Sequence, residues 1–138
     1  MFSTKNRRSI ITPEVESELY AYMGGIMKNL DSRCLAAGGT ENHVHLLISL
    51  SKNIALSKLM EEIKKSSSKW IKARGPGLGT FVWQEGYGAF SIGQSQVEAV
   101  RQYIARQKER HKKQTFEEEF ITLLKKYQVP YDERYIWS

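Results

Sequence analysis

The chain has 138 residues, of which 41% are hydrophobic and 26% are charged, a composition typical of one globular domain rather than a disordered chain. The formal net charge of +6 suits a polyanionic partner. Cys34 is the single cysteine, which excludes a disulfide framework and a cysteine-based zinc site. No apolar run reaches membrane-spanning length and the N-terminus has no signal-peptide core. We therefore expect a cytoplasmic protein with no membrane partner.

Basic residues precede the first predicted helix. Lys5, Arg7 and Arg8 form a loop cluster that is a candidate for phosphate contact, although such clusters are most often only solvated. Thr12 as N-cap and Pro13 at the first helical position predict that a helix begins here. Its apolar residues recur at helical spacing and predict a face that packs on the core.

Two antiparallel strands, 33–37 and 42–50, are predicted to follow as a hairpin. In the second strand His43 and His45 alternate with apolar residues. Side chains two residues apart share a face of a strand, so the two imidazoles should lie side by side, about 6–7 Å apart. They could hold one divalent cation between them. A His-x-His pair alone, however, is more often a hydrogen-bonded pair on a sheet face.

A second helix is predicted from about residue 54 to residue 72, capped by residues 51–53. Its lysines lie mostly outside the apolar stripe, and few acidic residues follow Glu62. A solvated face is the usual explanation for such a run, and phosphate binding is the alternative. The candidate DNA-binding residues of this helix are Lys64, Lys65, Lys69 and Lys72.

The last third of the chain predicts strand pieces at 81–84 and 87–92, then two helices. Capping boxes at Ser95 and Thr115 mark the helix starts. The first of these helices carries Tyr103 and Gln107, which are four residues apart and therefore share a face. Either residue alone would be unremarkable in a helix.

The aromatic residues of the strand pieces have two possible roles. Trp83, Tyr87 and Phe90 could stack on unpaired bases. Packing in the core or at the sheet edge is the more common role for such residues.

The order of elements predicts an α+β fold over the single domain 1–138. It is the ferredoxin-like, or RRM-like, antiparallel sheet with helices on one face plus a C-terminal helix. The opposite face should be open, and His43 and His45 should lie on it because Val44 and Leu46 point to the helices.

The chain resembles the single-domain HUH-type tyrosine transposases, close to their REP-associated branch. The resemblance spans nearly the whole chain in order, through residues 3–7, 39–47, 64–70, 83–91, 103–107 and 131–137. A histidine–hydrophobe–histidine motif is weak evidence alone, whereas this ordered set is specific.

The resemblance implies an enzyme that cleaves and rejoins single-stranded DNA at hairpin-containing ends. Tyr103 would be the nucleophile and form a covalent 5′-phosphotyrosine. His43, His45 and Gln107 would bind Mg²⁺ or Mn²⁺, a donor set with no carboxylate and with positions open for phosphate and water. His111 could assist but is expected to be exposed. The resemblance also implies a bacterial homodimer in which the tyrosine helix often serves the partner's metal site.

The sequence departs from this family at its start. Relatives have an apolar strand before the segment 3–7, and here only Met1 and Phe2 precede it. The expected explanations are an upstream start, repair of the sheet by another segment or partner, or an inactive copy. Two other functions stay open: a domesticated or inactive protein that holds hairpin DNA without cleavage, and an RRM-like RNA-binding module.

Overall fold

The computed structural model describes residues 1–132. The end of the predicted aromatic tail, residues 133–138, lies outside the described residues and includes part of the segment 131–137 that carried the resemblance. The elements are β1 (Phe2–Ser3), a 3-10 turn η1 (Lys5–Arg7), α1 (Pro13–Asn29), β2 (Arg33–Thr40), β3 (His43–Ser49), α2 (Leu56–Lys72), a second turn η2 (Gln94–Gln96), α3 (Val97–Ala105), α4 (Gln107–Arg110) and α5 (Phe116–Lys126).

The sheet is antiparallel with the strand order β1-β3-β2, which confirms the α+β prediction. β2 and β3 form the predicted hairpin around a turn at Glu41 and Asn42. β2 runs three residues further than predicted, through Gly38 and Gly39. These glycines let other chain segments come close, because a Cβ on Gly38 would lie 2.6 Å from the carbonyl oxygen of Ile104 in α3.

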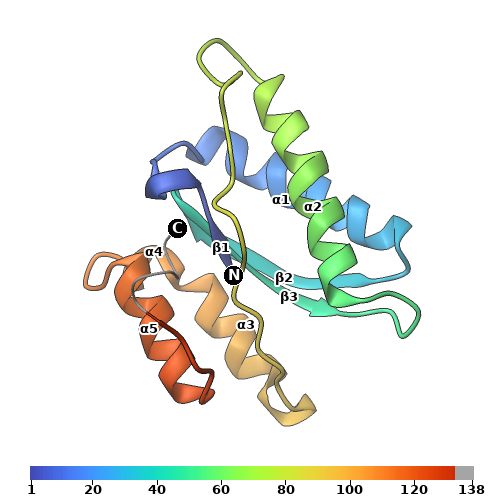
Figure 1. Ribbon diagram of the computed structural model, residues 1–138, viewed down its shortest axis with the longest axis vertical. Coiled ribbons are helices and arrows are strands. Elements are labelled where there is room, and N and C mark those ends of the chain that lie inside the picture. Colours follow the sequence, from blue (N-terminus) through green and yellow to red (C-terminus); the bar gives the residue numbers. More distant parts are fainter. Residues whose placement is uncertain (133–138) are drawn as a thin grey trace.

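Helices lie on both sides of this sheet (Figure 1). α1 and α2 pack together on one face, and α1 contacts β2. On the other face α3 contacts β2 and β3, and α4 contacts β2. The prediction that this second face would be open is therefore wrong for the described chain. Within residues 1–132, no helix is long and apolar enough to cross a membrane.

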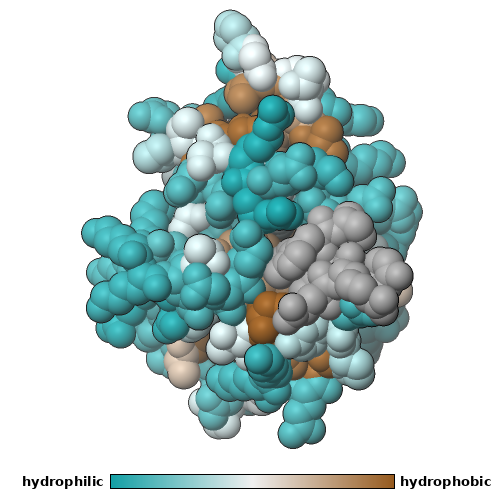
Figure 2. Space-filling view, turned by 60° about the vertical axis from the view of Figure 1, so that its left-hand side comes forward, coloured by the Kyte–Doolittle hydropathy of each residue, from teal (hydrophilic) through white to brown (hydrophobic). Residues whose placement is uncertain are grey.

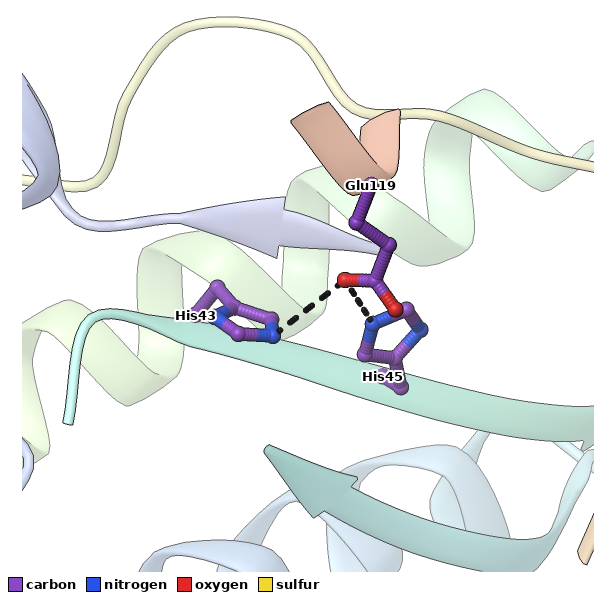
Figure 3. Close-up of side chains that lie close together, drawn as sticks. All are labelled: His43, His45 and Glu119. Carbon is purple, nitrogen blue, oxygen red and sulfur yellow. Dashed lines mark hydrogen bonds and ion pairs between the residues drawn. The ribbon is translucent and has the colours of Figure 1, made fainter. Parts of the chain in front are cut away.

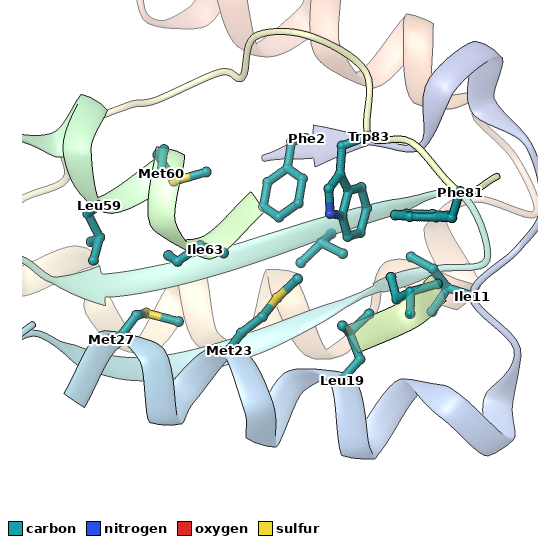
Figure 4. Close-up of a cluster of buried hydrophobic side chains, with 12 residues drawn as sticks. Phe2, Ile11, Leu19, Met23, Met27, Leu59, Met60, Ile63, Phe81 and Trp83 are labelled. Atoms are coloured by element: carbon teal, nitrogen blue, oxygen red, sulfur yellow. The ribbon is translucent and has the colours of Figure 1, made fainter. Parts of the chain in front are cut away.

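The main hydrophobic core fills the space between the sheet and the helices α1 and α2 (Figure 4). Leu19, Met23 and Met27 of α1 and Ile63 of α2 are fully buried there, together with Val44 of β3. Since Val44 points into this core, the alternation of a strand directs His43 and His45 to the other face.

The first strand is short, and the strands predicted at 81–84 and 87–92 are not regular. Thr4 and Trp83 form an isolated bridge, the Gln84 N–H donates to the Ser3 carbonyl, and the Gly88 N–H donates to the Met1 carbonyl. The segment 82–88 therefore runs beside β1, which lies between it and β3. This neighbour order matches the ferredoxin-like arrangement.

The helix starts were predicted with mixed success. The Thr115 capping box is present at the start of α5, with Thr115 and Glu118 bonded reciprocally. The Ser95 box is wrong, because α3 begins at Val97 without a side-chain cap. The helix predicted through His111 is also broken at Arg106, which has φ −100° and ψ 16°.

Candidate metal and nucleophile site

The two histidines of β3 lie side by side, as predicted. Their ring centroids are 5.2 Å apart. His43 is fully buried and His45 is 7% exposed, because α3, α4 and α5 cover this face. The pair is therefore an interior site and not part of an open sheet surface.

Tyr103 and Gln107 reach this pair from the same side although the helix breaks between them. Gln107 Oε1 lies 3.0 Å from His43 Nε2. The Tyr103 ring meets the His45 ring edge to face, with centroids 5.7 Å apart. All four predicted site residues thus meet within one chain.

A carboxylate that the sequence analysis missed lies at the centre of this group (Figure 3). Glu119 of α5 is 1% exposed. Its Oε1 is 3.2 Å from His45 Nε2 and 3.6 Å from His43 Nε2. Its Oε2 accepts hydrogen bonds from the Tyr103 hydroxyl and, at 3.0 Å, from Gln107 Nε2. The expectation of a site without a carboxylate is therefore wrong.

One signal in the sequence could have identified Glu119. It follows two other glutamates, which makes all three resemble ordinary acidic residues of a helix start. Yet positions 116, 119, 120 and 123 share one helical face, and the other three are Phe116, Phe120 and Leu123. A carboxylate on an apolar face predicts a buried partner.

His111 also belongs to the group and is not the exposed residue that was expected. Its side chain is 10% exposed. Its Nε2 lies 2.9 Å from Glu119 Oε1, and its ring centroid is 4.3 Å from that of His43. The carboxylate thus faces three imidazoles.

Burial controls the charges in this group. It lowers the pKa of His43 from 6.5 to about 3 and also lowers the pKa of His45. Burial alone would raise the pKa of Glu119, but hydrogen bonds from His45, Tyr103 and Gln107 outweigh it, so this pKa lies below its usual range. Burial and the bond to Glu119 raise the pKa of Tyr103. In the resting site His43 and His45 are therefore neutral, Glu119 is a carboxylate and Tyr103 is a protonated phenol.

The amides around His43 show whether this site fits a cation. Asn42 Nδ2 donates to the Arg7 carbonyl at 3.4 Å, and Asn42 Oδ1 lies 2.9 Å from His43 Nδ1. Gln107 Nε2 donates to Glu119, which turns Gln107 Oε1 toward His43 Nε2. A neutral imidazole carries one proton. On Nε2 it would be donated to Gln107 Oε1, while Nδ1 would accept from the Thr40 hydroxyl at 2.9 Å.

With the proton on Nδ1, His43 and the Thr40 hydroxyl can both donate to Asn42 Oδ1, and the free lone pair lies on Nε2. The Nε2 lone pair then converges with oxygens of Gln107 and Glu119. Such a group of lone pairs favours a cation. Ligand atoms of a divalent ion at 2.0–2.2 Å are themselves about 3 Å apart. His43, His45 and Gln107 therefore fit the implied metal.

A cavity of about 630 Å³ leads from the site and includes His45 and Tyr103 in its lining. Aromatic residues of the 87–92 segment and of the chain after α5 also line it, namely Tyr87, Phe90 and Tyr127. Phe90 and Tyr127 stack with ring centroids 4.9 Å apart. Outside this cavity, Figure 2 shows a largely hydrophilic surface on the side of the molecule that carries α4 and α5.

The predicted DNA-binding residues lie in two places, around η1 and on α2. Arg8 is exposed, Lys5 is half-buried, and Arg7 lies 3.8 Å from Glu117 of α5. Lys64 donates to the carbonyls of Gln84 and Gly86, both at 2.7 Å, and so holds the 82–88 segment. The other three lysines predicted to bind DNA are exposed and share one side of α2: Lys65, Lys69 and Lys72.

Comparisons with known proteins agree with this architecture. A family model described as "Transposase IS200 like" matches residues 1–107. The fold is similar to a crystal structure at 1.90 Å resolution of a Deinococcus radiodurans R1 protein named as a candidate transposase. The TM-score is 0.60 and the identity 20%, over 77% of this chain and 85% of that chain. No curated protein matches the chain. Because the family model covers well over half of the sequence, the chain belongs to the IS200-like transposase family.

Proposed function

We propose that this transposase cleaves and rejoins single-stranded DNA at hairpin-containing ends, with Tyr103 as the nucleophile. The observation that carries the proposal is the convergence of the Tyr103 hydroxyl, the His43–His45 pair and Gln107 inside one chain. A tyrosine hydroxyl beside a cation-binding group suits attack on a phosphodiester. Within residues 1–132, the group of histidine and carboxylate side chains close enough together to hold a metal ion lies at this same place.

The chemistry is a transesterification in which atoms and charges balance. The Tyr103 oxygen forms a bond to phosphorus as the bond from phosphorus to the 3′-oxygen breaks. The phenol proton ends on the released 3′-hydroxyl, and the DNA 5′ end stays attached to the tyrosine. Rejoining reverses these steps with another 3′-hydroxyl, so no energy source is needed.

The protein's contribution is to place these groups. His43, His45 and Gln107 would hold Mg²⁺ or Mn²⁺, which when bound would neutralise and orient the scissile phosphate. Glu119 accepts a hydrogen bond from the Tyr103 hydroxyl, which would keep this oxygen beside the imidazoles for attack on a bound phosphate. The guanidinium of Arg110 lies 4.5 Å from the centre of the Tyr103 ring and fixes its other face.

DNA would reach the site through the adjoining cavity. A single strand can place its bases on Tyr87, Phe90 and Tyr127, because aromatic rings stack with any base. Exposed lysines of α2 and the residues of η1 would contact phosphates elsewhere on the hairpin. A double helix is a poorer substrate because its bases are already stacked.

A covalent-adduct assay tests the proposal. Full-length protein is incubated with Mn²⁺ and a labelled single-stranded oligonucleotide that contains a hairpin, and the product is separated under denaturing conditions. We expect an adduct with the wild type and none with Tyr103→Phe, because the attacking oxygen is removed. Tyr22→Phe is the matched control, since Tyr22 is exposed on α1, and it should form the adduct normally.

The same assay decides between the proposal and its alternative. A wild-type protein that binds the hairpin but forms no adduct would be a domesticated or inactive DNA-binding protein. An RRM-like RNA module is not supported, because such a module needs an exposed sheet face with aromatic residues. Here the corresponding face carries His43 and His45 and is covered by α3 and α4.

The quaternary structure is a separate proposal. The family resemblance favours a homodimer with exchanged tyrosine helices. The geometry favours a site completed within each chain, since Gln107 of the same chain contacts His43. We therefore propose a homodimer in which each site is completed within one chain, without exchange of the tyrosine helices.

A further inference from the structure

The function proposed above gives Glu119 a part in holding the Tyr103 hydroxyl, but none in binding the cation. Glu119 lies beyond residue 107, where the family match ends. It is nevertheless among the most buried polar residues described, at 1% exposure. A buried carboxylate is costly unless charge or hydrogen bonding compensates it. The groups that compensate the buried carboxylate of Glu119 therefore indicate its role.

The two oxygens of Glu119 face different groups. Oε1 faces the imidazoles, with His111 Nε2 at 2.9 Å, His45 Nε2 at 3.2 Å and His43 Nε2 at 3.6 Å. Oε2 accepts from the Tyr103 hydroxyl and the Gln107 amide. One oxygen thus belongs to the cation-binding group and the other to the nucleophile (Figure 3).

The position of Oε1 is that of a metal ligand. The ligand atoms of His43, His45 and Glu119 all lie within 4.8 Å of one another. Neighbouring ligands of a divalent ion bound at 2.0–2.2 Å are about 3 Å apart, and opposite ones about 4 Å apart. Two imidazoles with one carboxylate are also a recurrent set for divalent transition metals, and the added carboxylate favours Mn²⁺ and Mg²⁺ over softer ions.

We propose that Glu119 binds the catalytic cation through Oε1 while its Oε2 holds the Tyr103 hydroxyl. The inference rests on the proposed function, since it assumes a cation on His43 and His45. One side chain from α5 then couples the position of the metal to that of the nucleophile. It also adds a negative ligand, which reduces the net charge of a divalent site from +2 to +1.

The test measures Mn²⁺ binding to the full chain by calorimetry, with no DNA. Glu119→Gln keeps the size of the side chain and removes its charge. We expect the affinity for Mn²⁺ to fall by more than about 100-fold, since loss of a group that only supports a ligand costs about 10- to 100-fold. Glu117→Gln, two residues earlier on α5 and partly exposed, should bind Mn²⁺ like the wild type. The visible absorption of bound Co²⁺ should also change in Glu119→Gln, because it reports the ligands directly.

The outcomes separate this inference from the proposed function. If His43→Gln loses Mn²⁺ binding while Glu119→Gln keeps wild-type affinity and an unchanged Co²⁺ spectrum, Glu119 is not a ligand and only this inference fails. If His43→Gln also binds Mn²⁺ like the wild type, the cation does not bind at His43 and the proposed cation site is wrong. If Glu119→Gln does not fold, Glu119→Asp is measured in its place. Its side chain keeps the negative charge but is shorter by one methylene, so wild-type affinity for Mn²⁺ in that variant would overturn the inference.

Discussion

At the residue scale, burial of His43 links stability to pH. Its pKa falls from 6.5 to about 3 on folding, so the unfolded chain binds a proton that the folded chain does not. The contribution to the free energy of unfolding is complete above about pH 6.5 and is lost as the pH falls toward 3. We expect metal-free protein to lose about 2 kcal/mol between pH 6.5 and pH 5 from this group.

Urea unfolding at constant ionic strength measures this loss. His43→Gln should lose less stability over the same interval, because it has no titrating ring. Some loss should persist, since burial lowers the pKa of His45 in the same direction. Stability that stayed constant or rose on acidification would show that His43 is accessible to protons in the folded protein.

At the element scale, the contact between β2 and α3 positions Tyr103 beside the histidines. Gly38 is opposite the carbonyl of Ile104, the residue after Tyr103, and any larger side chain would push α3 away. The break at Arg106 then redirects the chain so that Gln107 also faces β3. Gly38 in β2 thus decides how closely the tyrosine helix approaches the histidines.

The exposed side of α2 is the element from which we predict DNA binding. Replacing Lys65, Lys69 and Lys72 together by alanine should weaken binding of a hairpin oligonucleotide. The slope of log affinity against log salt should fall by about 2 if all three contact phosphates. Fluorescence anisotropy over a salt series gives both quantities. Lys64 is left intact because it holds the 82–88 segment.

Lys58→Ala is the matched control for these lysines. It lies on the same helix, but Glu61 and Glu62 already neutralise it, at 3.6 Å and 3.2 Å. Its removal should leave DNA affinity unchanged. An unchanged affinity and salt slope in the triple variant would mean that this side of α2 is only solvated.

At the scale of the whole molecule, the residues of the proposed site meet within one chain. We therefore expect that mixing His43→Ala protein with Tyr103→Phe protein does not restore the DNA adduct. Each chain would lack one part of its own site, whether or not the chains form dimers. The adduct assay measures this after the two proteins are unfolded and refolded together. Recovery of the adduct would show instead that α3 is exchanged between subunits.

The short β1 has a consequence for the molecule as well. β1 is two residues long, whereas β3 continues to Ser49 and the neighbouring segment continues past Gly88. The cavity beside the site lies in this region, since Met1 and Phe2 line it together with Leu46 to Ile48 of β3. The cavity beside the site is therefore lined by β1, by β3 and by the segment that runs beside β1.

Local pattern was enough to predict much of this protein. Alternation along residues 43–49 defined which face carries the two histidines, and the Thr115 capping box marked the start of α5. The order of elements predicted the α+β class, and the ordered motifs predicted the transposase family. Each of these depends on interactions within a few residues or on the linear order of motifs.

Tertiary structure decided the rest. Glu119 is 74 residues from His45 in the sequence, yet its Oε1 lies 3.2 Å from His45 Nε2. The residues around Glu119 in the sequence do not indicate that His45 is its partner. The covering of the histidine face, the break at Arg106 and the burial of His111 likewise result from how α3, α4 and α5 pack on the sheet. A side chain's periodicity shows which way it points, but its burial and its pKa depend on residues that the chain brings there from far away.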